Sequence, residues 1–129
     1  MPKRQMAFAA APPATVVEGM SYSTQVKITN LSTRADVPWE YTFKVKFELH
    51  LYGMDVPYDT KTNTVWIAES GEALSSYVMT VPTGFVGTYG TLLVRLLTSN
   101  EARVLKQVNG DFLIASAAVE PSGLISWTT

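Results

Sequence analysis

Hydrophobic and polar residues alternate most clearly between Trp39 and Leu51. Seven apolar or aromatic side chains occupy every second position of this stretch, and charged or polar side chains stand between them. Successive side chains of a β-strand point to opposite faces, whereas a helix would distribute the apolar positions around its axis. The pattern therefore predicts a long strand over 39–51 with one buried and one solvated face.

Shorter runs of alternating or β-branched residues follow along the rest of the chain. They predict further strands over 22–30, 64–68, 73–81, 88–98, 102–108, 112–118 and 124–127, separated by turn signals. Asn109-Gly110 is the strongest of these signals, because both residues tolerate the positive φ of a two-residue hairpin. Turn signals about every ten residues, without an amphipathic helix, predict an all-β fold: a single antiparallel, immunoglobulin-like β-sandwich of about seven to nine strands.

The chain is expected to form one domain over residues 1–129, because no shift in composition, repeat or low-complexity tract divides it. Residues 1–14 are expected to be an N-terminal arm or edge strand, and residues 119–129 a C-terminal extension. The N-terminal apolar stretch is cut short by Pro12-Pro13, whereas a secretory signal needs an apolar core of about 7–15 residues. We expect an uncleaved start or the start of a mature chain. No apolar run approaches the roughly 20 residues that span a bilayer.

Composition excludes several kinds of chemistry. Ten Lys+Arg stand against eleven Asp+Glu, for a formal net charge of −1, which argues against a nucleic-acid-binding protein. The chain has no cysteine and one histidine, so disulfides, thiolate nucleophiles and thiolate or multi-histidine metal sites are excluded. We therefore expect neither a cofactor nor a bound metal.

His50 is the only side chain whose unperturbed pKa lies near neutrality. It follows Glu48 on the polar face of the long strand, where it could serve as a base or as a single metal ligand. A solvated surface position explains it more simply, because polar strand positions are normally exposed. No Gly-x-Ser-x-Gly elbow and no acid placed to form a triad accompany it. The chain is expected not to be an enzyme.

A possible ligand patch follows the long strand. Exposed aromatic rings bind the apolar faces of sugars while neighbouring polar groups bind the hydroxyls. Paired carboxylates could also hold calcium, although their spacing here matches no EF-hand loop. The alternative is that Trp66 belongs to the core and that the two tyrosines cover an edge of the sandwich. The patch would consist of Tyr52, Asp55, Tyr58, Asp59 and Trp66.

The strand over 88–98 carries leucines on both faces. Leu93 and Leu97 share one face with Arg95, and the opposite face is also apolar. A sandwich strand normally has one solvated face, so either a terminal segment of the chain or a second subunit is expected to cover these leucines. The expected interface residues are Leu93, Leu97, Leu124 and Trp127.

Four stretches carry a resemblance to a known family. They are VVEG before YSTQVKITN, the strand WEYTFKVKFELHLYG, the segment TVWIAESGEALSSYVMTVP and the run GFVGTYGTLLVRL, and together they cover a little over half of the chain. Their order resembles the immunoglobulin-like CARDB (cell-adhesion-related) modules of bacterial and archaeal surface proteins. The resemblance implies adhesion, spacing or ligand binding within a larger protein, and it implies no catalytic residue.

These observations favour a non-catalytic structural or interaction module. We expect it to self-associate or to join a larger assembly, such as a surface layer, an appendage or a virion, through sheet edges and an apolar sheet face. The expected partner is a protein, as a homo-oligomer or within a larger assembly. The alternative function is a β-sandwich module that binds carbohydrate or another small ligand.

Overall fold

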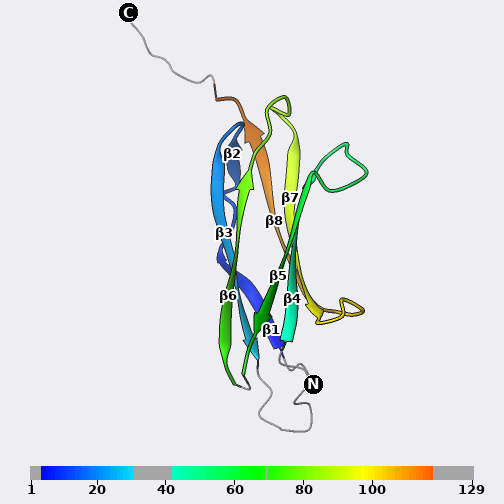
Figure 1. The fold of residues 1–129 in the computed structure, drawn as a ribbon. Helices are drawn as coiled ribbons and strands as arrows, with labels where there is room; N and C mark the ends of the chain where they lie inside the picture. Colours follow the sequence, from blue (N-terminus) through cyan, green and yellow to red (C-terminus); the bar gives the residue numbers. More distant parts are fainter. Residues whose placement is uncertain (1–3, 31–41, 69, 118–129) are drawn as a thin grey trace, which may run out of the picture.

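The structure, a computed structural model, describes residues 4–30, 42–68 and 70–117, which form two β-sheets packed face to face (Figure 1). Sheet A consists, in spatial order, of β1 (Arg4–Ala10), β3 (Ser21–Asn30) and β6 (Glu72–Thr80). Sheet B consists, in spatial order, of β2 (Thr15–Val17), β8 (Val104–Ala115), β7 (Tyr89–Thr98), β4 (Thr42–Leu51) and β5 (Asp59–Trp66). The predicted all-β, immunoglobulin-like sandwich is confirmed.

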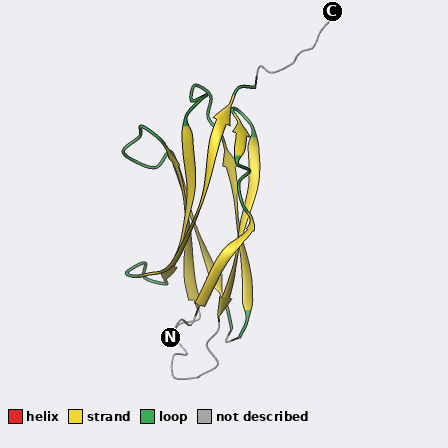
Figure 2. Cartoon of the chain, turned by 180° about the vertical axis from the view of Figure 1, so that it is seen from behind, coloured by secondary structure: helices red, strands yellow, loops and turns green. Residues whose placement is uncertain are grey.

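The N-terminal segment contributes a strand to each layer. β1 pairs with β3 in sheet A, and the chain then crosses to sheet B, which it joins as β2 (Figure 2). β2 runs parallel to β8, with Thr15 opposite Leu113 and Val17 opposite Ala115. The other strand pairs of the described residues are antiparallel, as predicted, and β2 is the exception, because the chain crosses between the layers instead of turning back in a hairpin.

The core lies between the sheets and follows the alternation of β4. The side chains of Phe43, Val45, Phe47, Leu49 and Leu51 are buried, and the residues between them face the outside of sheet B, where all but Glu48 are partly exposed. The predicted long strand is confirmed from Thr42 to Leu51, and its first three predicted residues lie outside the described residues. Sheet A contributes the facing layer of the core. Its buried side chains include Val26, Ile28, Tyr77 and Met79.

Asn109-Gly110 is not a turn. β8 runs through both residues, with Asn109 opposite Leu93 and Gly110 opposite Leu92. A Cβ atom at Gly110 would lie 2.9 Å from the ring of Pro12, so glycine is needed where the N-terminal segment crosses over β8. The predicted hairpin is wrong because a close packing contact, and not a turn, requires the glycine.

One lateral side of the sandwich is formed by β5 and β6, which Figure 1 shows nearest the viewer as the last strand of each sheet. The two strands are joined by side chains. The Asn63 amide donates to the hydroxyl of Ser75 and to the backbone carbonyl of Ser76, at 2.9 and 3.0 Å. The Tyr77 hydroxyl donates to Asp59. These bonds fix the edge of sheet A against the edge of sheet B.

Candidate functional site

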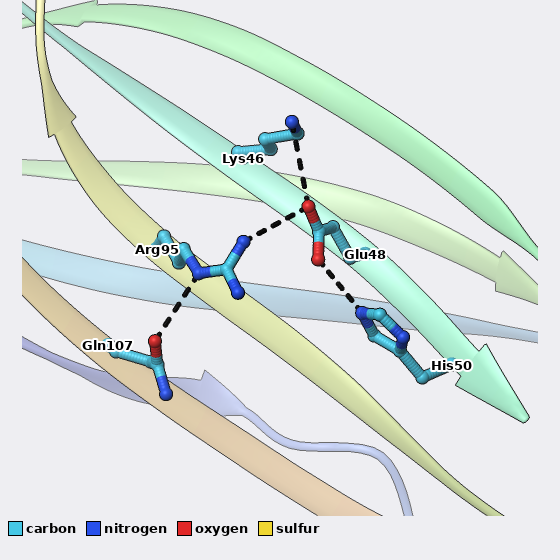
Figure 3. Close-up of polar contacts among 5 residues, drawn as sticks. All are labelled: Lys46, Glu48, His50, Arg95 and Gln107. Carbon is cyan, nitrogen blue, oxygen red and sulfur yellow. Dashed lines mark hydrogen bonds and ion pairs between the residues drawn. The ribbon is translucent and has the colours of Figure 1, made fainter. Parts of the chain in front are cut away.

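The outer face of sheet B carries a cluster of charged side chains centred on Glu48 (Figure 3). Every second residue of β4 points outward, and the cross-strand register places Lys46 opposite Arg95 of β7 and Arg95 opposite Gln107 of β8. We call Lys46, Glu48, His50, Arg95 and Gln107 the Glu48 cluster. The sequence pattern places Lys46, Glu48 and His50 on one face of their strand, and the strand order brings Arg95 and Gln107 beside them.

Glu48 is the only acid of this cluster, and its side chain is almost fully buried. One of its oxygens lies 2.8 Å from His50 Nε2, and the other accepts a hydrogen bond of 3.1 Å from Arg95. The Lys46 ammonium lies 3.5 Å away, and Gln107 accepts from Arg95 Nε. Burial opposes ionisation of the carboxyl group, but the hydrogen bond with His50 and the charges of Arg95 and Lys46 hold the pKa of Glu48 below its ordinary value.

The contacts of the Glu48 cluster stabilise the ionised form of Glu48 and do not favour its protonation. Three basic side chains stabilise the Glu48 carboxylate, so it is a poor proton acceptor. His50 is held by Glu48 and is not the freely solvated residue that the sequence suggested. Among the described residues, no three His, Asp or Glu side chains lie close enough together to hold a metal ion.

We expect Glu48→Gln to lower the free energy of unfolding by about 1–2 kcal/mol, because three basic side chains lose their carboxylate. The folded-state pKa lies below the ordinary value of 4.5, so this stabilisation is complete above that value and is lost as the pH falls through the folded-state pKa. Urea unfolding at several pH values should show the difference between the two proteins shrinking below about pH 4.5.

Glu72→Gln is the matched control. Glu72 also pairs with a lysine, at 3.4 Å from Lys27, but both side chains are about half exposed. Its replacement should change stability by less than about 0.5 kcal/mol at every pH. Equal effects of the two substitutions would contradict the account of the Glu48 cluster.

A shallow hollow lies beside this cluster, at the end of β4. Its volume is about 420 Å³, and it is lined by His50, Leu51, Tyr52, Tyr89, Gly90, Thr91 and Asp111. The backbone N–H of Tyr52 donates to the carbonyl of Tyr89 at 2.9 Å, which continues the β4–β7 ladder and sets the two tyrosines opposite each other. Their side chains are 83% and 64% exposed. We call this group the tyrosine hollow.

The structure divides the predicted ligand patch. Tyr52, Asp55 and Tyr58 are exposed on the β4–β5 connection, as expected. Asp59 instead accepts a hydrogen bond from Tyr77, at the junction of the two sheets. Trp66 is exposed but pairs with Thr42, at the far end of β5 from Asp59, so it does not join the tyrosines.

The predicted interface is also divided. Leu97 is only 5% exposed within a single chain and lies where the pairing of β7 with β8 shifts register. Leu93 is half-buried between Glu48 and Asn109 on the neighbouring strands. Leu124 and Trp127 lie outside the described residues. An interface at Leu93 and Leu97 remains a prediction.

Sequence reasoning missed two apolar side chains on the outer face of sheet A. Leu74 and Val78 of β6 are 56% and 58% exposed, whereas Ala73, Tyr77 and Met79 of the same strand turn inward. The signal was present, because this strand carries apolar residues on both faces. The signal is weak, because only two apolar residues lie on the outer face and Ser76 stands between them.

Comparisons with known proteins give matches among solved structures only. No family model matches the chain, and no curated protein matches it, so the resemblance to CARDB modules remains a prediction. Matches among solved structures include the ASH / PapD-like domain 7 of human CEP192, with 13% sequence identity and a TM-score of 0.41. That match covers 92% of this chain and 88% of the other. Within the described residues, no helix has the length and apolar character needed to cross a membrane.

Proposed function

We propose that the chain is a non-catalytic structural module that associates with copies of itself through an open sheet edge. The observation that carries the proposal is β6, a nine-residue strand at the edge of sheet A. Its pairing with β3 runs from Ser21–Thr80 to Thr29–Glu72 without a register shift. A long, regular edge strand with exposed apolar side chains is a template for pairing with another strand.

The other edges of the two sheets carry features that discourage such pairing. β1 is interrupted by a register shift between Phe8 and Ala10, and β2 has only three residues. β5 carries Asp59 and Lys61 on the side that faces sheet A, and inward-pointing charges oppose strand addition. β6 has no proline, no lysine and no bulge, and its single charged residue, Glu72, is its first. The contrast supports β6 as the edge through which copies associate.

The test is the mass of the chain in solution. Light scattering over a range of concentrations should give a mass above 14.1 kDa for the unmodified protein. Val78→Lys places a charge on the open edge and should return the mass to that of a monomer. Ser23→Lys is the matched control, because Ser23 lies opposite Val78 on β3, is exposed on the same face and is one strand away from the edge.

Two outcomes would overturn or redirect the proposal. A monomer at every concentration contradicts self-association outright. Loss of the oligomer in Leu93→Ser, with Val78→Lys unaffected, would assign the contact to the outer face of sheet B instead. A component of a surface layer, an appendage or a virion must associate with copies of itself. The described residues form one hydrophobic core, so each copy can fold before it associates.

The tyrosine hollow supports a second candidate, the binding of a small polar ligand such as a carbohydrate. Two exposed rings offer apolar contact, and His50 and Asp111 offer a donor and an acceptor beside them. A glycan array should then contain a ligand whose binding is lost in Tyr89→Ala and retained in Trp66→Ala, because Trp66 lies at the far end of β5. An array without any bound glycan would remove this candidate.

A further inference from the structure

We infer that two copies of the chain pair along β6 in antiparallel orientation, with Ser76 opposite Ser76 of the second copy. This inference rests on the proposed function and specifies its contact. The pairing would join the two A sheets into one continuous sheet. Three observations carry it: the direction of the backbone groups of β6, the spacing of its exposed apolar residues and the position of its only charge.

The backbone of β6 shows which residues are available. The carbonyl of Tyr77 points toward β3, where it accepts a hydrogen bond of 2.7 Å from the Thr24 hydroxyl. The carbonyl of Ser76 points the opposite way, since the Asn63 amide reaches it from β5. Successive residues of a strand direct their N–H and C=O groups to opposite lateral sides, just as their side chains point to opposite faces. The even-numbered residues of β6, whose side chains lie on the outer face, therefore direct their N–H and C=O groups to the open edge.

The exposed apolar residues are symmetric about the centre of the strand. Leu74 and Val78 each lie two residues from Ser76. In an antiparallel pair centred on Ser76, Leu74 of each copy lies directly opposite Val78 of the other. Apolar cross-strand pairs of this kind contribute roughly 0.2–1 kcal/mol each. The pairing covers two side chains whose exposure the folding of a single chain does not explain.

Charge and register select the same alignment. Centred on Ser76, the pairing uses all nine residues of β6 and places Glu72 opposite Thr80, so the two Glu72 carboxylates lie at opposite ends. A shift of one strand by two residues places Val78 opposite either Glu72 or Ser76. Each such shift separates the apolar pairs. Among these registers, only the one centred on Ser76 keeps both Leu74–Val78 pairs.

Asn63 does not block this contact. A carbonyl oxygen has two lone pairs, and the Asn63 amide uses one lone pair of the Ser76 carbonyl. The second lone pair remains for the N–H of the opposite strand. Figure 1 shows β5 and β6 together on the side that a second copy would approach.

The absence of cysteine makes the register directly testable. Ser76→Cys introduces a single thiol at the twofold axis, and mild oxidation or a short bis-maleimide should convert most of the protein into a covalent dimer. Thr80→Cys is the matched control on the same strand and face. Its two thiols would lie about 27 Å apart in this register, so it should give no cross-link. Ser23→Cys, one strand away, should also give none.

The outcomes separate the two proposals. Cross-linking of Ser76→Cys alone supports the register. An unmodified protein that is oligomeric while Ser76→Cys remains uncross-linked contradicts the register and leaves self-association standing. Cross-linking of Ser23→Cys as efficient as that of Ser76→Cys would mean that two A sheets meet face to face. A monomeric unmodified protein contradicts both proposals.

A second variant tests the edge without a thiol. The N–H of Ser76 points away from β3, so Ser76→Pro removes a donor at the open edge and leaves the backbone pairing with β3 intact. The exposed hydrogen bond from Gln25 of β3 to the Ser76 hydroxyl is lost as well. The dissociation constant should rise at least about tenfold, with the circular dichroism spectrum unchanged. An unchanged dissociation constant in a folded variant would contradict pairing along β6.

Discussion

Replacing Phe47 by alanine is expected to lower the free energy of unfolding by about 3–5 kcal/mol. Phe47 is fully buried on the inward face of β4, and its ring stacks on that of Tyr77 in the opposite sheet, with centroids 5.4 Å apart. Loss of the ring removes apolar burial and leaves a cavity where sheet A meets sheet B. Because small domains are typically stable by about 5–15 kcal/mol, this single change would remove a large share of the total.

Tyr77→Phe separates the packing of this ring pair from its polar contact. The variant keeps the stacked rings and removes the hydroxyl that donates to Asp59. Its cost should be about 1 kcal/mol, the usual contribution of one hydrogen bond. Urea unfolding of the three proteins gives the comparison. A cost of Phe47→Ala no greater than that of Tyr77→Phe would show that the stacked pair does not hold the two sheets together.

The same ring pair positions the edge that the proposed function uses. Tyr77 lies between Ser76 and Val78, so its packing on Phe47 fixes the inward face of β6. Burial and the hydrogen bond to Asp59 both raise the pKa of the Tyr77 hydroxyl, which keeps it protonated and donating. The outer residues of β6 therefore belong to a strand whose inward face is anchored in the core.

Local pattern was sufficient to predict the fold class. The alternation in β4 is a property of neighbouring residues, and it identifies both the strand and its buried face without knowledge of the rest of the chain. Turn signals between the runs then imply antiparallel layers. The parallel pairing of β2 with β8 was not predictable in this way, because it joins residues about a hundred positions apart.

Which residues become neighbours in the candidate sites depends on the order of strands in the sheet, and the hydrophobic pattern of the sequence does not specify that order. The sequence predicts Tyr52 as a ligand residue because an aromatic side chain follows the long strand, but Tyr89 becomes its neighbour only because β7 pairs with β4. Trp66 is close to Tyr58 in sequence and distant in the sheet, because β5 runs back along the full length of β4. A residue at the end of the strand that follows a turn therefore lies a full strand length away from the residues of the turn itself.

Gly110 gave the most misleading signal, because sequence does not distinguish a glycine in a turn from a glycine at a close packing contact. Gly110 was expected in a hairpin and lies within β8, beneath Pro12. Gly90 lies within β7, opposite Phe112 of β8 and Leu51 of β4. Neither glycine has the positive φ that a tight turn would require. The missing side chains leave room for the Pro12 ring at Gly110 and for the Phe112 ring at Gly90. These contacts form only when the chain is folded, so the sequence does not show them.

Gly90→Ala is therefore expected to destabilise the domain by about 1–3 kcal/mol. A Cβ atom at this position would lie 2.6 Å from the ring of Phe112 and 2.8 Å from the carbonyl oxygen of His50. Neither neighbour can retreat easily, because Phe112 is buried in the core and the His50 carbonyl belongs to the backbone of β4. Thermal or urea unfolding measures the cost.

The same substitution in a Phe112→Ala background tests the cause. Removing the ring should itself cost about 3–5 kcal/mol, but it also removes one of the two contacts that oppose a Cβ atom at Gly90. The added cost of Gly90→Ala should then fall without vanishing, since the carbonyl of His50 remains in place. Strictly additive costs would mean that the Phe112 ring does not explain the glycine, and that the backbone contact with β4 alone requires it.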